Sequence, residues 1–149
     1  MLALTADQLA ELARLAAAAF PREACALLLG SEHGDGLIEI TRIVAADNIA
    51  ATPEREFELD PAVHIRLLRE LREAGGPERI VGHWHSHPNG HGEPSAQDAA
   101  MASDPGMLWL ISAVTAAGAG PPQAFRPQAG PDGRVRRFEP VPVDITDRQ

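Results

Sequence analysis

The chain has 149 residues, 44% of them hydrophobic, and its 21 acidic and 13 basic residues give a formal net charge of −8. This length suits one domain and is too short for two ordinary ones. The negative charge argues against nucleic acid and anionic membranes as partners, because both attract positive surfaces. The lone cysteine, Cys25, excludes an intrachain disulfide and a Cys-x-x-Cys zinc knuckle. It is compatible with a reducing cytoplasm, where we expect the protein to reside.

The first part of the chain predicts one helix and three strands. Charged residues interrupt positions 2–20, so we expect an amphipathic helix there and no signal peptide. Thr5 and Gln8 form a capping box that begins this helix, which ends at Phe20 because Pro21 follows. The strands expected next are 24–29, ended by Gly30, its hairpin partner 37–44, and a short strand at 57–59.

The second part predicts two more helices among strands. Asp60 and Pro61 begin a helix that Gly75 and Gly76 end. The later elements expected are a strand at 80–86, a loop at 88–94, a helix from Ser95 to Met101, and strands at 108–114, 123–126 and 134–138. No segment approaches the ~20 apolar residues of a membrane span. The order of elements predicts an α/β domain with a single mixed β-sheet flanked by helices.

The segment His83-Trp84-His85-Ser86-His87-Pro88 contains the most informative residues of the chain. Alternate side chains of a strand share a face, so His85 and His87 can present two imidazoles to one point. Asp98, in the first turn of the next helix, can be brought back to the same point by the loop. Two histidines and one carboxylate, with a fourth position left for water, make a hydrolytic zinc site. We therefore expect one Zn²⁺ per chain, bound by these three residues.

A zinc site of this kind predicts a hydrolytic mechanism. Zinc lowers the pKa of bound water to about 7, and a nearby carboxylate can move the proton to the leaving amine. Ser95 lies three residues before Asp98, on the same face of a helical turn. Its hydroxyl is placed to stabilise an oxyanion, and it can also serve as the N-cap of the helix.

These residues resemble the JAMM motif of the MPN+ (JAB-type) metallopeptidases. The likeness rests on His85-Ser86-His87-Pro88, with seven residues between His87 and Ser95 and two between Ser95 and Asp98. The segment 21–30 resembles the part of the family that carries a catalytic glutamate, and Asn48 and residues 57–61 also match family positions. Ala26 departs from the pattern, because the family usually has glycine there. The likeness runs from about Pro21 to Leu110.

The resemblance implies a cytidine-deaminase-like MPN/JAB fold for a single domain over residues 1–149. It implies that His85, His87 and Asp98 bind zinc, that Glu23 is the general acid/base, and that Ser95 steadies the tetrahedral intermediate. It also implies a substrate, a ubiquitin-like protein cleaved after its C-terminal Gly-Gly. The chain lacks the insertions of eukaryotic deubiquitinases, so a sulfur-carrier protein suits it better as partner.

Other assignments of the polar residues remain open from the sequence. His83 shares the face of His85 and could pair with it, although a buried, hydrogen-bonded imidazole is favoured because Asp98 is farther away. Glu93, in the loop, is a rival to Glu23 as the base. His91 is expected to be a solvated loop residue. Cys25, Trp84 and Trp109 are expected to pack in the core.

Three other kinds of protein share features with this sequence. A cupin-like metal protein also uses His-x-His and a nearby glutamate, but no histidine follows Glu93 to complete its ligand set. An amidohydrolase barrel needs ~250 residues. A non-catalytic MPN-type scaffold that binds ubiquitin-like partners usually lacks the metal ligands, which are all present here. Zinc content without turnover would favour that scaffold.

Overall fold

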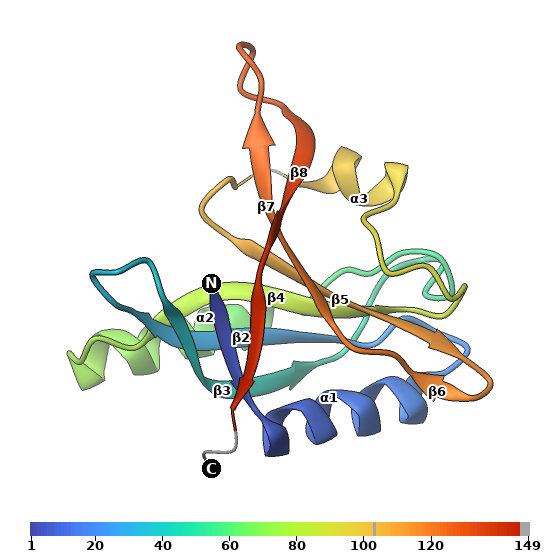
Figure 1. Cartoon of the computed structure of the whole chain (residues 1–149), viewed down its shortest axis with the longest axis horizontal. Coiled ribbons are helices and arrows are strands. Elements are labelled where there is room, and N and C mark those ends of the chain that lie inside the picture. Colours follow the sequence, from blue (N-terminus) through green and yellow to red (C-terminus); the bar gives the residue numbers. More distant parts are fainter. Residues whose placement is uncertain (103, 147–149) are drawn as a thin grey trace.

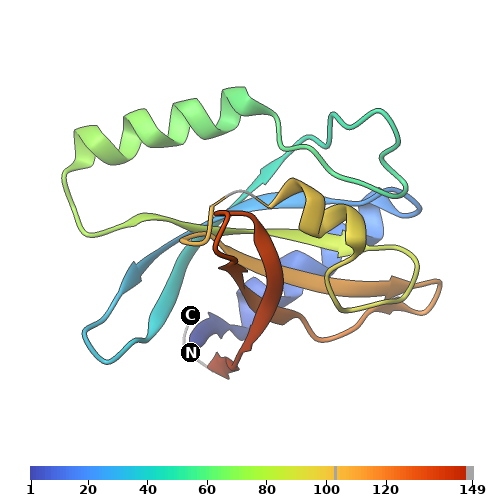
Figure 2. The same ribbon diagram turned by 90° about the horizontal axis from the view of Figure 1, so that it is seen from above.

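A computed structural model describes residues 1–102 and 104–146 of the chain. The strands of this part form one mixed sheet in the order β8-β7-β5-β4-β2-β3-β1-β9, with β6 paired to β5. Figures 1 and 2 show α1 and α2 on opposite sides of the curved sheet, with α3 near one end. The architecture confirms the predicted α/β class, a mixed sheet flanked by helices.

The helices and strands have the following bounds. The helices are α1 (Ala6–Ala19), α2 (Pro61–Ala74) and α3 (Ala96–Met101). The strands are β1 (Leu2–Thr5), β2 (Cys25–Glu32), β3 (Ile38–Ala46), β4 (Arg79–His87), β5 (Leu108–Thr115), β6 (Gly118–Ala119), β7 (Gln123–Ala129), β8 (Val135–Val141) and β9 (Val143–Thr146).

The ends of the two long helices lie where the sequence predicts them. Thr5 Oγ1 accepts from the backbone of Gln8 at 3.1 Å, and Gln8 Oε1 accepts from the backbone of Thr5 at 2.9 Å. This capping box begins α1, and Phe20 is its C-cap. Asp60 caps α2, and Gly75 ends it in the left-handed region at φ 67°. Local capping chemistry therefore sets these boundaries.

Several strand predictions are wrong in detail. The strands expected at 123–126 and 134–138 continue to Ala129 and Val141. β2 does not end at Gly30 but continues to Glu32. A Cβ at Gly30 would lie 2.3 Å from the carbonyl oxygen of Glu39, so this glycine permits close approach of β3. Residues 57–59 form no strand and contribute only an isolated bridge between Asn48 and Leu59.

The terminal strands β1 and β9 were not predicted from the sequence. Each has four residues, too few to show a clear alternation. β1 pairs in parallel with both β3 and β9, so residues near the two ends of the chain complete one edge of the sheet. Their pairing depends on contacts between distant parts of the chain, which local patterns do not encode.

The two faces of β2 separate the core into two regions. Ala26 and Leu28 belong to a cluster on the side of α1, which contributes Leu12 and Ala16. Leu27 and Leu29 pack on the other side with Leu67 of α2. The alternation of side chains along β2 explains this division. The metal-ligand candidates lie on the α2 side.

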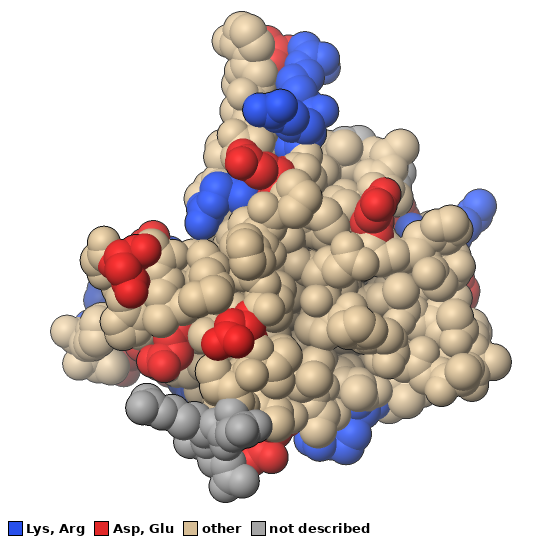
Figure 3. All heavy atoms as spheres, viewed as in Figure 1, with Lys and Arg blue, Asp and Glu red and all other residues tan. Residues whose placement is uncertain are grey.

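The surface carries both acidic and basic residues. Figure 3 shows basic atoms along the hairpin of β7 and β8, whose second strand contains Arg136 and Arg137. Acidic and basic groups are otherwise scattered over the face shown. In the described part of the chain, no helix is long and apolar enough to cross a membrane. The cytoplasmic location stays a prediction.

Candidate metal centre

The two histidines of the motif come from the end of β4, in the interior of the sheet. The strand runs between β2 and β5, and His85 is paired with Cys25 on one side and Ile111 on the other. Both imidazoles are buried. Asp98 reaches them from α3, where the backbone of Ser95 donates to Asp98 Oδ2 at 2.9 Å. The capping of α3 therefore also orients the carboxylate.

His85, His87 and Asp98, called the metal triad below, converge on one point. The two Nε2 atoms of the histidines lie 3.0 Å apart. Asp98 Oδ2 lies 3.0 Å from Nε2 of His87, and Oδ1 lies 3.4 Å from Nε2 of His85. Zinc held tetrahedrally by bonds of ~2.0–2.2 Å requires ligand atoms roughly 3.3 Å apart. The triad therefore fits a zinc ion with little rearrangement.

The surroundings of the triad fix the ring of His87 and support that of His85. Nδ1 of His87 lies 3.0 Å from the backbone oxygen of His91, so Nδ1–H donates and the Nε2 lone pair is left for a metal. The Phe57 ring stacks on His85 with a centroid distance of 4.2 Å. The side chain of His91 is exposed, as predicted, but the role of its carbonyl was missed. A backbone acceptor leaves no signal in residue identity.

Glu23 lies beside the triad although it is 62 residues from His85 in the sequence. One of its carboxylate oxygens and one ring nitrogen from each of His85 and His87 lie within 4.8 Å of one another. The rival base, Glu93, has an exposed side chain. The structure thus brings Glu23 to the histidines.

Backbone contacts hold Glu23 in place. Its nitrogen donates to the carbonyl of Pro53 at 2.6 Å. Asn48 Nδ2 donates to the carbonyl of Glu23 at 2.9 Å and to that of Glu56 at 3.0 Å. Asn48 therefore links the loop after β3 to the segment before β2. The sequence marked Asn48 only through the family resemblance, and the structure gives it a positioning role.

The carboxyl of Glu23 is poised to exchange protons near neutral pH. Burial raises its pKa from 4.5 to about 7, with His87 opposing the rise and Asp98 and Glu56 adding to it. Its Oε1 atom is buried and has no hydrogen-bond partner among the described residues. A carboxyl with this pKa and a free oxygen can both take up and release a proton at pH 7.

The protonation of the triad follows from the charge of Asp98. Burial raises the pKa of Asp98, but its hydrogen bonds with His85 and His87 outweigh burial and hold the pKa well below its usual range. Burial lowers the pKa of His87, yet the hydrogen bond and charge of Asp98 raise it overall. Burial leaves the pKa of His85 lowered. An ionised aspartate and a neutral His85 suit metal binding.

Ser95 is the N-cap of α3. Its Oγ accepts from the backbone nitrogen of Asp98 at 3.0 Å, which confirms the cap. Ser95 lies three positions before Asp98, with two residues between them. The role of this hydroxyl as an oxyanion donor stays a prediction.

The remaining residues singled out in the sequence are packed in the core. Cys25 is buried, and burial raises the pKa of its thiol to about 12. Trp84 lies on the opposite face of β4 and donates to Ser112 Oγ at 2.9 Å. Ala26 shares the core cluster of Trp84, so its methyl group points away from the triad. His83 is buried as predicted, but Nε2 lacks the expected hydrogen-bond partner among the described residues.

Comparison with known proteins agrees with this geometry. Residues 5–128 match the family described as prokaryotic homologs of the JAB domain. A desampylase from Haloferax volcanii is 36% identical over 91 residues, which are 61% of this chain and 62% of that protein. The 26S proteasome non-ATPase regulatory subunit 14 of Drosophila melanogaster is 31% identical over 48% of this chain, but the match spans only 23% of its own length.

Solved structures extend the likeness over nearly the whole chain. The solution structure of a protein from Desulfitobacterium hafniense superposes with a TM-score of 0.79 at 29% identity, covering 99% of this chain and 94% of that one. A protein from Salinibacter ruber gives a TM-score of 0.65 at 27% identity, covering 99% and 92%. The match with the two named relatives spans 62% and 23% of their own lengths, so it covers less than two thirds of either protein. The match with the two solved structures covers nearly all of each.

Proposed function

Because this chain belongs to the family of prokaryotic homologs of the JAB domain, we propose that it is a zinc-dependent peptidase or isopeptidase. We propose further that it hydrolyses the bond after the C-terminal Gly-Gly of a ubiquitin-like or sulfur-carrier protein. The observation that carries the proposal is the convergence of His85, His87 and Asp98 beside Glu23. The name of the Haloferax volcanii relative, desampylase, supports a reaction of this class.

In this proposal the role of the metal triad is to bind the zinc ion. Its histidines present their Nε2 atoms, and Asp98 supplies a carboxylate whose negative charge is retained because its pKa is held well below the usual range. A bound zinc ion would polarise the scissile carbonyl and acidify a water molecule. The hydrogen bond from His87 Nδ1 to the backbone oxygen of His91 holds the ring of His87 in place. The bond from the backbone nitrogen of Ser95 holds the carboxylate of Asp98. Both bonds orient the proposed ligands before a metal binds, which reduces the reorganisation that binding requires.

Glu23 and Ser95 act on the substrate and the water in this proposal. Glu23 accepts the proton from the attacking water on its free oxygen and delivers it to the leaving nitrogen. Ser95 donates its hydroxyl hydrogen to the oxygen of the scissile carbonyl as negative charge develops there. The backbone nitrogen of Asp98 remains bonded to Ser95 Oγ, so capping and donation are compatible.

The proposal is tested with zinc-loaded protein and candidate carriers that end in Gly-Gly. Each carrier is offered with one further C-terminal amino acid, or joined through Gly-Gly to a lysine side chain, and the products are weighed by mass spectrometry. This chain contains no lysine, so any newly released lysine amine comes from the substrate. We expect products ending in Gly-Gly. Stoichiometric zinc with no cleavage of any carrier would favour the non-catalytic scaffold.

A further inference from the structure

A pocket of about 450 Å³, called the Glu23 pocket below, lies at the start of β2. Its walls come from the second half of α1, from the segment that leads into β2, and from the end of β3. Five alanines and Leu15 make most of the wall small and apolar, and Glu23 is one of the lining residues. The volume is in the range of pockets that bind small molecules.

The Glu23 pocket is bordered by residues from both faces of the sheet. Leu15 and Ala24 pack against the core cluster on the side of α1. Cys25 belongs to the cluster of Phe57, whose ring stacks on a histidine of the metal triad. Because β2 begins only at Cys25, the sheet does not separate its two sides before that residue. A molecule in the pocket therefore lies against Glu23 without having to cross the sheet.

Two opposite charges in the wall are available to a ligand. Arg22 and Asp47 line the pocket with exposed side chains, and in the part of the chain that the structure describes neither side chain forms a salt bridge or hydrogen bond. Arg22 is the one basic residue of the wall. A guanidinium matches a carboxylate through two parallel hydrogen bonds. The pocket thus offers a carboxylate site beside an apolar wall.

The position of the pocket fits the released half of a substrate. In the proposed reaction, Glu23 delivers a proton to the leaving nitrogen, so the leaving group lies beside this residue. β2 pairs with β4 so that Cys25 is opposite His85. From that level the chain runs back through Glu23 to Arg22, away from the histidine. The released group is therefore directed toward Arg22.

We propose, building on the proposed function, that the Glu23 pocket binds the group released from Gly-Gly, and that this group is a single uncharged amino acid whose free α-carboxylate pairs with Arg22. The alanines leave room for an aliphatic side chain, and Asp47 repels an acidic one. A lysine within an isopeptide-linked target has no free α-carboxylate, because its carbonyl continues into the target chain. The pocket therefore favours removal of a terminal amino acid over cleavage of an isopeptide bond.

The first experiment measures binding to the pocket without requiring turnover. L-leucine, or L-leucinamide, which lacks the carboxylate, is titrated into the ¹⁵N-labelled, zinc-loaded protein. NMR follows the backbone amides of Ala45 and Ala46 and the Nε–H of Arg22. We expect L-leucine to bind about ten- to a hundredfold more tightly than the amide. Equal affinities, or no saturable shifts, would refute the inference whether or not the chain hydrolyses any carrier.

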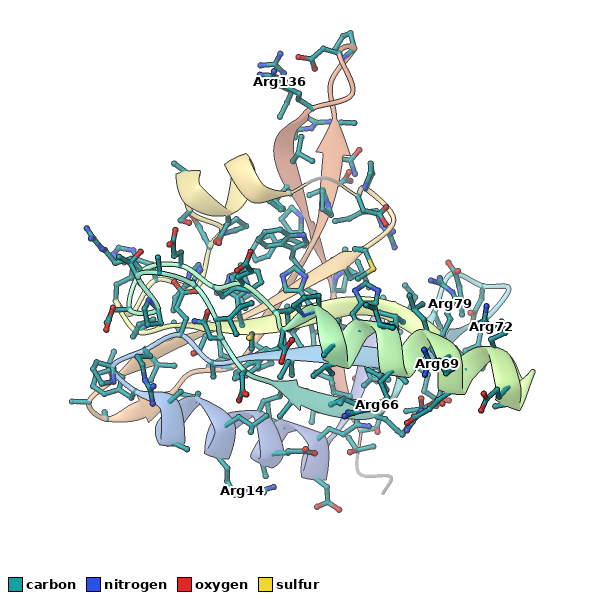
Figure 4. The ribbon with its side chains drawn as sticks, turned by 180° about the vertical axis from the view of Figure 1, so that it is seen from behind. Arg14, Arg66, Arg69, Arg72, Arg79 and Arg136 are labelled. Carbon is teal, nitrogen blue, oxygen red and sulfur yellow. The ribbon has the colours of Figure 1, made fainter. Side chains whose placement is uncertain are left out.

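Two arginine variants test the origin of this preference. Arg22→Gln should make L-leucine and L-leucinamide bind equally. Arg14→Gln is the matched control, because Arg14 is also exposed but is not among the lining residues, and Figure 4 shows it on the side of α1 that faces away from the sheet. This control should preserve the preference. A preference that survives Arg22→Gln contradicts the assignment of the carboxylate partner.

Two neighbouring alanines of α1 test where the amino acid binds. Ala18 lines the pocket, whereas Ala17 is also exposed and is not among the lining residues. Ala18→Trp should fill the pocket and abolish the binding of L-leucine, and Ala17→Trp should preserve it. Undiminished binding in Ala18→Trp would place the amino acid elsewhere and overturn the proposal.

The leaving-group role also predicts that the bound amino acid lies close to the metal. Cobalt(II) replaces zinc in this experiment because it is paramagnetic and broadens the signals of nearby nuclei. We expect the cobalt-loaded protein to broaden the Hα signal of L-leucine far more than the zinc-loaded protein does, and free L-leucinamide to show a weaker effect at the same concentration. If cobalt-loaded protein bound L-leucine without such broadening, the pocket would be separate from the reaction, and the leaving-group role would be wrong.

Discussion

The Oγ atom of Ser86 accepts a hydrogen bond from the backbone nitrogen of Ala24 at 2.8 Å. Ser86 lies between the two histidines of the metal triad, and Ala24 directly follows Glu23. The backbone nitrogen of Ser86 also donates to the carbonyl of Ala24 at 3.0 Å. The two bonds join the strand that carries His85 and His87 to the segment that carries Glu23, and so they fix the spacing between the metal triad and the proposed base.

Ser86→Ala should therefore reduce catalysis more than metal binding. Loss of the hydroxyl leaves the Ala24 amide unpaired, which costs about 1–3 kcal/mol of unfolding free energy. A shift of Glu23 by about 1 Å can lower kcat by ~10². Zinc content, kcat and urea denaturation would be measured together.

Ser112→Ala is the matched control for this prediction. Ser112 is also buried, and its hydroxyl accepts a hydrogen bond from Trp84, which lies on the face of the sheet opposite to the metal triad. The substitution should destabilise the protein by a similar amount and leave kcat of the remaining folded protein unchanged. A parallel fall of kcat in both variants would reduce the Ser86 effect to stability alone.

Alanine at any member of the metal triad should remove zinc. Each replacement deletes one of the three proposed protein ligands. This is a larger change than loss of a hydrogen bond to a ligand, which itself weakens metal binding by ~10–100-fold. Zinc affinity is measured by competition with a chromophoric chelator. His91→Ala is the control, because only its backbone oxygen contacts His87. Undiminished affinity in His85→Ala, His87→Ala or Asp98→Ala contradicts the assignment of that ligand.

Glu23→Gln should preserve zinc and abolish most turnover. Glutamine keeps the size of the side chain but cannot accept the proton, so kcat should fall by about 10²–10⁴. Glu93→Gln, on the exposed loop, should have little effect. If instead Glu93→Gln lost turnover and Glu23→Gln kept it, the base would be the loop residue.

The raised pKa of Glu23 makes a separate prediction about the metal-free protein. The folded state holds this proton up to about pH 7, whereas the ordinary pKa of the group is 4.5. Between these values the folded state binds more protons than the unfolded state, so stability falls as pH rises. Glu23→Gln cannot ionise and should escape this fall. Denaturation with urea and a chelator at pH 5 and pH 8 should show the variant gaining stability, relative to the natural chain, only at the higher pH.

The parts of the fold that depend on local chemistry could be predicted from the sequence. The capping residues Thr5, Asp60 and Ser95 fixed the starts of the three helices. The spacing of His85 and His87 on a strand placed both on one face. These predictions needed only a few neighbouring residues each.

The contacts between distant segments could not be predicted from residue patterns. Glu23 reaches the histidines because β2 pairs with β4 in a register that sets Cys25 beside His85. Many registers would satisfy the apolar pattern of β2, since its residues are buried on both faces. For the same reason the stacking of Phe57 on His85 was missed, and residues 57–59 were mistaken for a strand. Only the family resemblance selected Glu23 in advance.

Ser95→Ala should separate the two roles assigned to this residue. Loss of the N-cap should lower the unfolding free energy by about 1 kcal/mol, because the Asp98 amide loses its acceptor. Loss of an oxyanion donor should lower kcat by about 10²–10³ with a smaller change in KM. Zinc content must be measured alongside, since the backbone of Ser95 also orients Asp98. Ser95→Thr keeps the hydroxyl and the cap and should restore both properties. A normal kcat in Ser95→Ala, with only the stability reduced, would show that Ser95 acts as a cap alone.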